Sequence, residues 1–133
     1  MTDETIDEIK EQRMQELHNQ GDDGSDAGAA EPAEPVEIED ADHLQSVVDE
    51  YDTVLVDFYA TWCGPCQMME PAVEKLAGED GVVVAKVDVD QRKQLAQAWG
   101  VQAMPTLVVA EDGEEVQRVK GARSYDGLRG LVA

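Results

Sequence analysis

The pattern of apolar and polar positions alternates between strand and helix character from residue 36 onward. Residues 53–60 and 82–89 are nearly continuous apolar runs, which is typical of strands buried on both faces of a sheet. After Asp40, whose residue type often caps helices, apolar side chains recur at helical spacing. They predict a helix whose buried face carries Leu44, Val47, Val48 and Tyr51. Shorter patterns predict strands over residues 36–38, 106–110 and 115–119, and helices over residues 63–77, 91–99 and 124–132.

Turn-forming residues separate these elements. Residues 111–114 carry the Asp-Gly signal of a hairpin between the last two strands, and Gly100 ends the helix before it. We expect Pro71 to bend its helix, and Gly127 and Gly130 to weaken the last helix. Buried, mostly parallel strands need helices on both faces, and the closing hairpin adds antiparallel strands. The sequence therefore predicts the α/β class, with a three-layer α/β/α sandwich around a central mixed sheet.

Composition divides the chain into an acidic N-terminal extension and one domain. Residues 1–42 hold 15 acidic and 2 basic side chains, whereas residues 43–133 hold 15 acidic and 8 basic ones. The extension contains a charged segment with a thin apolar stripe at helical spacing. This segment is either a solvated, partly frayed helix on a disordered tether or a helix that docks onto a partner or onto the domain. The expected segments are an extension over residues 1–35, with a helix over 5–20 and a linker over 21–35, and a domain over 36–133.

The net charge limits the partners and the compartment. The chain has 30 acidic and 10 basic side chains, a formal net charge of −20. Such a surface repels nucleic acid and anionic membranes, so neither is an expected partner. Its self-repulsion is relieved by concentrated salt, which favours a halophile cytosol over an ordinary cytoplasm with a merely acidic protein or tail. The first residues lack the basic and apolar regions of a secretory signal, so we expect a cytoplasmic protein.

Two cysteines, Cys63 and Cys66, carry the most informative chemistry. They follow a buried strand and open a helix, so both sulfurs lie within the first helical turn. Unpaired backbone N–H groups and the helix dipole favour a thiolate there. Cys63 comes first and is expected to be the more exposed nucleophile, while Cys66 is placed to resolve a mixed disulfide. Between them, Pro65 removes a backbone donor and stiffens the turn.

Two other functions for the cysteine pair are less consistent with the sequence. A zinc site needs about four ligands, and the chain offers only His18 and His43 besides the two thiols. An inert structural disulfide would gain little entropy from closing so short a loop, and the cytosol is reducing. We therefore expect no metal and no cofactor, and a redox-active pair.

Asp57 is unusual because it interrupts an otherwise apolar strand. A buried carboxylate without a partner costs several kcal/mol, so it must be neutral, paired or in contact with water. One interpretation is an acid at the strand edge that reaches solvent. The other is a desolvated carboxyl group with a raised pKa, poised to exchange a proton with Cys66.

An ordered series of stretches in the chain resembles the thioredoxin family. The first contains the strand, Trp62 and the Cys-Gly-Pro-Cys loop, and the others follow in the family's order over about 100 residues. A resemblance of this length is far more specific than an isolated pair of cysteines. It implies the thioredoxin fold for residues 36–133. The matching stretches are residues 56–66, 84–91, 104–107, 112–114 and 120–122.

The resemblance also implies roles for several residues. Asp57 matches the aspartate thought to exchange a proton with the second cysteine, and Lys86 matches the lysine that pairs with that aspartate. Met104-Pro105 matches a bond that is cis in the family and lies against the cysteines, leaving the Met104 backbone free to pair with an extended substrate. The flat contact surface around the sulfur is expected to comprise Trp62, Gly64, Pro65 and the Gly121 loop.

The function implied is a protein-disulfide reductase, which needs thioredoxin reductase or an equivalent electron donor and disulfide-bearing protein substrates. The Gly-Pro dipeptide between the cysteines favours a reductant over an oxidase or isomerase. The alternative is an interaction or regulatory subunit with a thioredoxin fold, in which the redox centre is secondary. We expect a monomer. Gln67 departs from the family, which commonly has a basic residue there, and so does Met104, which replaces a branched apolar residue.

Overall fold

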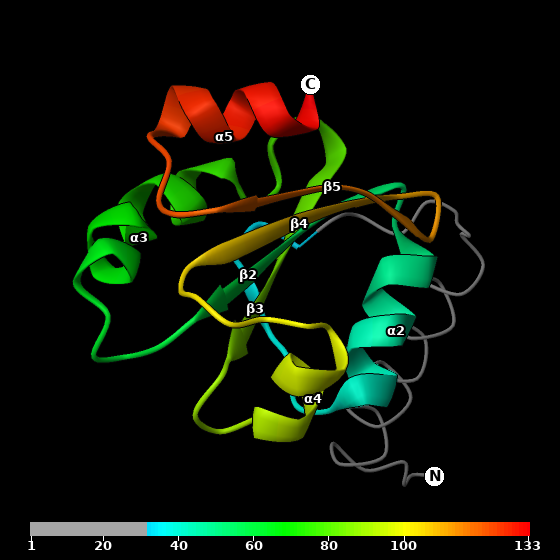
Figure 1. Ribbon diagram of the computed structural model, residues 1–133. Coiled ribbons are helices and arrows are strands. Elements are labelled where there is room, and N and C mark those ends of the chain that lie inside the picture. Colours follow the sequence, from blue (N-terminus) through cyan, green and yellow to red (C-terminus); the bar gives the residue numbers. More distant parts are fainter. Residues whose placement is uncertain (1–31) are drawn as a thin grey trace, which may run out of the picture. The chain divides into compact units, whose positions relative to one another are not determined.

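A five-stranded sheet forms the centre of the computed structural model, which describes residues 32–133 (Figure 1). The helix predicted over residues 5–20 and nearly all of the linker predicted over 21–35 lie outside the described residues, and both stay predictions. The strands run in the order β1-β3-β2-β4-β5 across the sheet. Their bounds are Val36–Glu37 for β1, Thr53–Tyr59 for β2, Val82–Asp88 for β3, Thr106–Glu111 for β4 and Glu114–Lys120 for β5.

The sheet is mixed, as predicted. Strands β1, β3 and β2 are mutually parallel, whereas β4 pairs antiparallel with β2, and β5 pairs antiparallel with β4. The central strand, β2, places Asp57 opposite Lys86 of β3 on one side and opposite Leu107 of β4 on the other. At the hairpin, Asp112 and Gly113 both have positive φ angles, 53° and 87°, which suits a two-residue turn between twisted strands.

Helices cover both faces of the sheet and complete the predicted three layers (Figure 1). Helices α2 (Ala41–Glu50) and α4 (Lys93–Ala98) lie on one face, and α3 (Gly64–Leu76) and α5 (Tyr125–Val132) lie on the other. On the α2 side, the buried cluster joins Leu44 to Val56. On the α3 side, a separate cluster joins Val73 and Leu128 to Leu55. Because side chains alternate along a strand, Asp57 shares the α3 side with Leu55.

Helix ends follow the sequence signals with one correction. The Asp40 side chain caps α2 by accepting a 2.7 Å hydrogen bond from the backbone N–H of His43, as predicted. Helix α4 is shorter than the predicted 91–99 because Arg92 has non-helical angles (φ −124°, ψ 57°). Gln91 and Arg92 instead donate their backbone N–H groups to the Asp88 carbonyl in a turn. Gly100, with φ 71°, ends α4 at the expected place.

The C-terminal helix forms as predicted and is anchored by a cap, a buried side chain and an ion pair. Ser124 caps α5 by accepting a 3.1 Å hydrogen bond from Gly127 N–H, and Leu128 is completely buried. A 3-10 turn over Glu79–Gly81, not predicted from the sequence, contacts this helix: Arg129 forms a 2.6 Å ion pair with Asp80. Nowhere in residues 32–133 is a helix both long and apolar enough to cross a membrane.

Candidate active site

The two cysteines lie where β2 gives way to α3. Cys63 is the N-cap residue of α3, and its Sγ accepts a 3.2 Å hydrogen bond from the backbone N–H of Cys66. The two Cα atoms are 5.3 Å apart, within the range that a disulfide requires, and the two sulfurs are bonded. The structure is therefore the oxidised form. The first turn of α3 carries no acidic side chain, so no carboxylate of that turn offsets the positive end of the helix dipole beside Cys63.

The two cysteines are almost equally buried in the oxidised form. Cys63 is 5% exposed and Cys66 is 4% exposed, and the more exposed Cys63 expected for the reduced form stays a prediction. In the disulfide each sulfur shields the other, and the loop that contains Met104 covers Cys63 from the side, with the Met104 carbonyl oxygen 3.8 Å from Sγ. The intervening Gly64 and Pro65 are exposed.

The loop before β4 packs against the cysteine pair. Its Met104-Pro105 peptide bond is cis, which confirms the prediction made from the resemblance. The Pro105 carbonyl accepts a 2.8 Å hydrogen bond from Gly121 N–H, which ties the Gly121 loop to this one. Within residues 32–133, neither backbone polar group of Met104 is bonded to another backbone group. A second polypeptide can therefore pair with Met104 at this point, in the manner of an added strand.

Trp62, the residue before the nucleophile, is a large apolar side chain that is mostly exposed. Its side chain is 66% exposed, and its indole Nε1–H donates a 2.8 Å hydrogen bond to Asp90. Asp90 is itself oriented by its backbone N–H, which donates to the Asp88 carboxylate at 3.0 Å. The ring is thus fixed at one edge while its remaining surface faces solvent. The substrate-contact roles of Trp62, Gly64, Pro65, Met104, Pro105 and Gly121 stay predictions.

Asp57 is a buried carboxyl group, and the strand-edge interpretation is wrong. The residue is only 2% exposed, and its Oδ1 has no hydrogen-bond partner among the described residues. Burial raises the pKa of Asp57 from 3.8 to about 7, because desolvation penalises the charged form. The positive charge of Lys86 lowers this pKa, and the carboxylates of Glu70 and Glu37 raise it. A carboxyl group of this kind can take up and release a proton near neutral pH.

Lys86 does not form the ion pair with Asp57 that the resemblance implied. Its ammonium group bonds the carboxylate of Glu70 on α3 and lies 4.3 Å from the centre of the Tyr59 ring. Tyr59 in turn donates a 2.6 Å hydrogen bond to Glu37, and burial and this bond raise the pKa of Tyr59. Among the described residues, the ion pair of Lys86 is the one with Glu70. Asp57 and Lys86 interact through space, as strand neighbours without direct contact.

Sequence reasoning missed two residues that complete the site. Glu70 lies four residues after Cys66, a spacing that places both on the same side of α3, and this was the available signal. Asp90, which orients Trp62, follows β3 by two residues and left no signal, because the contact joins residues 28 positions apart. Both contacts depend on how the chain folds back on itself.

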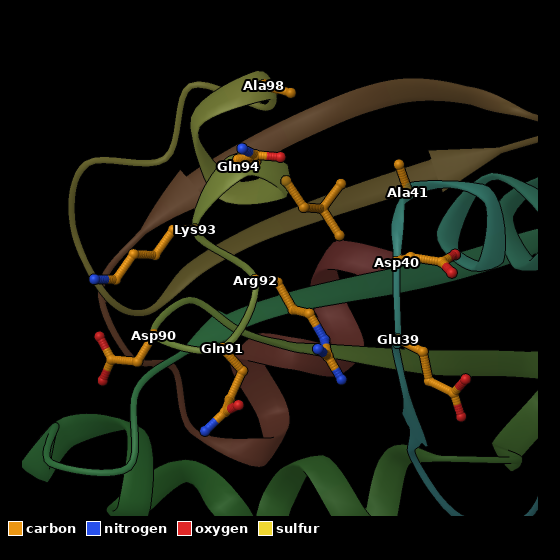
Figure 2. A pocket seen from close by; sticks show the side chains of 10 residues that line it. Glu39, Asp40, Ala41, Asp90, Gln91, Arg92, Lys93, Gln94 and Ala98 are labelled. Atoms are coloured by element: carbon orange, nitrogen blue, oxygen red, sulfur yellow. The ribbon is translucent and has the colours of Figure 1, made fainter.

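A hollow of about 360 Å³ adjoins the site, with Cys66, Tyr59 and Glu70 among its lining residues. A larger one, of about 660 Å³, lies between the start of α2 and the start of α4 (Figure 2). The Arg92 side chain lines this larger hollow, and its Nε–H donates a 3.1 Å hydrogen bond to the Ile38 carbonyl. Within residues 32–133, no group of three or more His, Cys, Asp and Glu side chains is arranged to hold a metal ion.

Comparison with known proteins agrees with this geometry. Residues 34–133 match the family model described as Thioredoxin. The chain belongs to the thioredoxin family. Thioredoxins are thiol–disulfide oxidoreductases, and this thioredoxin-family chain carries the bonded Cys63–Cys66 pair that such an enzyme requires.

Individual relatives show how far the likeness extends. The solved structure of a mutant thioredoxin from Halobacterium salinarum NRC-1 is 48% identical, with a TM-score of 0.75, over 79% of this chain and 93% of that chain. Thioredoxin H2-1 from rice (Oryza sativa subsp. japonica) is 53% identical over 70 residues, 52% of this chain and 51% of that protein. A bifunctional thioredoxin reductase/thioredoxin from Mycobacterium leprae is 39% identical over 94 residues, 69% of this chain. The chain thus spans about half of the rice protein and 20% of the mycobacterial one.

Proposed function

We propose that this thioredoxin-family protein reduces disulfides in other proteins through Cys63 and Cys66. The observation that carries the proposal is the bonded pair at the first turn of α3, beside the cis Met104-Pro105 loop and with exposed Gly64 and Pro65 between the two cysteines. The helix terminus favours the thiolate form of the reduced Cys63. The loop offers a backbone edge to an extended substrate.

In the first step, the Cys63 thiolate attacks one sulfur of the substrate disulfide. A bond forms between Cys63 Sγ and that sulfur, the substrate S–S bond breaks, and the departing substrate sulfur takes up a proton. The backbone groups of Met104 hold the substrate segment next to the nucleophile. Reduced Cys63 thus becomes half of a mixed disulfide.

In the second step, Cys66 loses its proton to Asp57 and attacks Cys63 Sγ. The mixed disulfide breaks, the Cys63–Cys66 disulfide forms, and the second substrate sulfur leaves as a thiol after protonation. Asp57 suits this step because burial raises its pKa to about 7, so it accepts a proton near neutral pH and returns it to solvent. Two electrons and two protons from a donor then restore the dithiol.

The donor is proposed to be thioredoxin reductase or an equivalent enzyme, and the substrates are disulfide-bearing proteins. The mycobacterial relative, named a bifunctional thioredoxin reductase/thioredoxin, supports this choice of donor. We place the protein in the cytoplasm, because a dithiol that must be kept reduced works in a reducing compartment. It acts as a monomer: the large apolar side chains exposed in residues 32–133 are Trp62, Met68 and Val116, too few for the core of an obligate dimer interface.

We also propose that the protein works in a salt-rich cytosol. Its formal net charge of −20 is spread over the extension and the domain, because residues 43–133 alone carry 15 acidic and 8 basic side chains. Concentrated salt screens this self-repulsion. The likeness to the thioredoxin of Halobacterium salinarum supports the same conclusion.

Reduction of insulin by a chemical dithiol, followed as turbidity, tests the reductase function. The wild-type chain should accelerate precipitation, and Cys63→Ser should lose the acceleration entirely. Equal rates for the two proteins would show that the domain is not a reductase. A redox titration against a couple of known potential tests the direction: thioredoxins are among the more reducing couples, and a strongly oxidising value would make the protein an oxidase.

A further inference from the structure

Glu70 lies near the resolving cysteine, Cys66, and bonds Lys86, the strand neighbour of the buried Asp57. It is on α3, one helical turn after Cys66, and it lines the hollow of about 360 Å³ that reaches Cys66. It also lines a second hollow of about 430 Å³, together with Lys86, Glu37 and Glu74. Its carboxylate bonds the Lys86 ammonium. A single side chain of α3 thus connects the surroundings of Cys66 to strand β3.

Lys86 also lies opposite a second carboxyl group, that of Asp57. Lys86 and Asp57 are directly opposed in the parallel pairing of β2 and β3, and their side chains project toward the same face, the one covered by α3. A buried carboxylate and an ammonium group in this arrangement attract each other strongly, because few water molecules screen them. Asp57 Oδ1 nevertheless has no partner among the described residues, and the ammonium lies with Glu70 and the Tyr59 ring.

We propose that Glu70 is a positioning residue for the proton transfer: it keeps the Lys86 ammonium bonded to helix α3 and out of contact with Asp57, which leaves the buried carboxyl group without a contacting cation. The inference rests on the proton-accepting role proposed for Asp57. A carboxyl group in direct contact with Lys86 would stay ionised at neutral pH and would be a poor acceptor for the Cys66 proton.

The charges around Asp57 agree with this arrangement. From the elements packed against it, Lys86 of β3, Glu70 of α3 and Glu37 of β1 face the carboxyl group, and β4 contributes the apolar Leu107. The Glu70 side chain is one-third exposed, so solvent weakens its direct repulsion of Asp57. We therefore expect Glu70 to affect the Asp57 carboxyl group mainly by holding Lys86 in place. Glu37 is engaged by the Tyr59 hydroxyl group.

The test is the pKa of the Asp57 carboxyl group, measured by carbon NMR in the oxidised full chain, with Asp57→Asn to assign the resonance. Glu70→Gln should lower this pKa by about one unit, because Lys86 is released toward Asp57. Glu74→Gln is the matched control. Glu74 lies one turn further along α3 and, like Glu70, lines the hollow of about 430 Å³, but the described ion pairs do not join it to Lys86. It should change the pKa much less, and Glu70→Asp should restore part of the wild-type value.

Measurements in a Lys86→Gln background distinguish two effects of Glu70: positioning of Lys86 and direct repulsion of the Asp57 carboxylate. In Lys86→Gln, the Asp57 pKa should rise, and adding Glu70→Gln should then lower it by less than it does in the wild type. An equal decrease in both backgrounds, an unchanged pKa in Glu70→Gln, or an equal effect of Glu74→Gln would overturn the inference and leave the reductase function intact. A wild-type Asp57 pKa near 4 would instead remove the proposed role of Asp57 and the inference with it.

The same variants have a kinetic readout. In single-turnover reduction of a protein disulfide, the pH at which the resolving step reaches half its maximal rate should move to lower pH in Glu70→Gln, and Glu74→Gln should follow the wild-type profile. A Glu70→Gln profile that matches the wild type would contradict the inference.

Discussion

Asp57 and Lys86 occupy opposed positions on parallel strands β2 and β3, yet the Lys86 ammonium bonds Glu70 of the neighbouring helix. The buried carboxyl group therefore has a cation nearby but not in contact. Desolvation outweighs the attraction, and the pKa of Asp57 rises to about 7. The reaction proposed for Cys66 needs an acceptor with this property.

The raised pKa predicts how stability depends on pH. Between about pH 4 and pH 7, folded Asp57 keeps a proton that the unfolded chain has lost, so the free energy of unfolding falls as the pH rises through this window. A rise of about three pKa units corresponds to about 4 kcal/mol. Urea unfolding of the oxidised wild type and Asp57→Asn at pH 4 and pH 8 should show the wild type losing about that much relative to the variant. Parallel pH dependences would contradict the buried, proton-binding Asp57.

Cys66→Ser should trap substrates. The Cys63 thiolate can still attack a protein disulfide, but nothing resolves the product, so mixed disulfides accumulate. Non-reducing gels of the variant incubated with a disulfide-bearing protein should show a covalent adduct that a reductant removes. Cys63→Ser is the control, because it lacks the nucleophile and should form no adduct. Adducts of equal yield in both variants would contradict the assignment of Cys63 as the nucleophile.

Trp62→Ala should weaken substrate binding and leave folding almost unchanged. The side chain is 66% exposed, so its removal should change the free energy of unfolding by less than about 1 kcal/mol. We expect a higher KM for insulin with little change in the rate toward a small disulfide, which does not reach the indole surface. A lower rate toward both substrates would indicate that Trp62 affects the cysteines themselves.

Leu128→Ala tests how firmly the last helix is held. Leu128 is completely buried against α3, so truncation should cost about 2–5 kcal/mol in the free energy of unfolding, measured in urea. Leu131→Ala, at a partly buried position of the same helix, should cost clearly less. Equal small losses would show that α5 contributes little to the core.

Salt should stabilise the protein through its charge. At pH 7, raising KCl from low to molar concentration should raise the melting temperature, because the formal net charge of −20 repels itself and salt screens it. The increase should shrink near pH 4, where many carboxylates are protonated. A salt effect of the same size at both pH values would mean that it does not arise from carboxylate repulsion.

Local patterns were enough to predict most of the architecture. The apolar runs of β2 and β3 identify buried strands, because a strand covered on both faces cannot tolerate many polar side chains. The Asp40 cap, the Asp112-Gly113 turn and Gly100 were readable because each is decided by the backbone conformation of a few consecutive residues. The start of α4 was harder to predict, since Gln91 and Arg92 donate their backbone N–H groups to the Asp88 carbonyl in a turn.

The residues of the site also fall into those that the sequence predicts and those that only the tertiary structure reveals. The position of Cys63 and Cys66 at the start of a helix follows from the sequence alone, because strand, turn and helix are consecutive there. Only the tertiary structure decided that Lys86 bonds Glu70 and that Asp90 orients Trp62. These contacts join residues 16 and 28 positions apart. Their geometry depends on how α3 and the segment after β3 pack on the sheet, and no local preference of the chain encodes which carboxylate an ammonium group reaches.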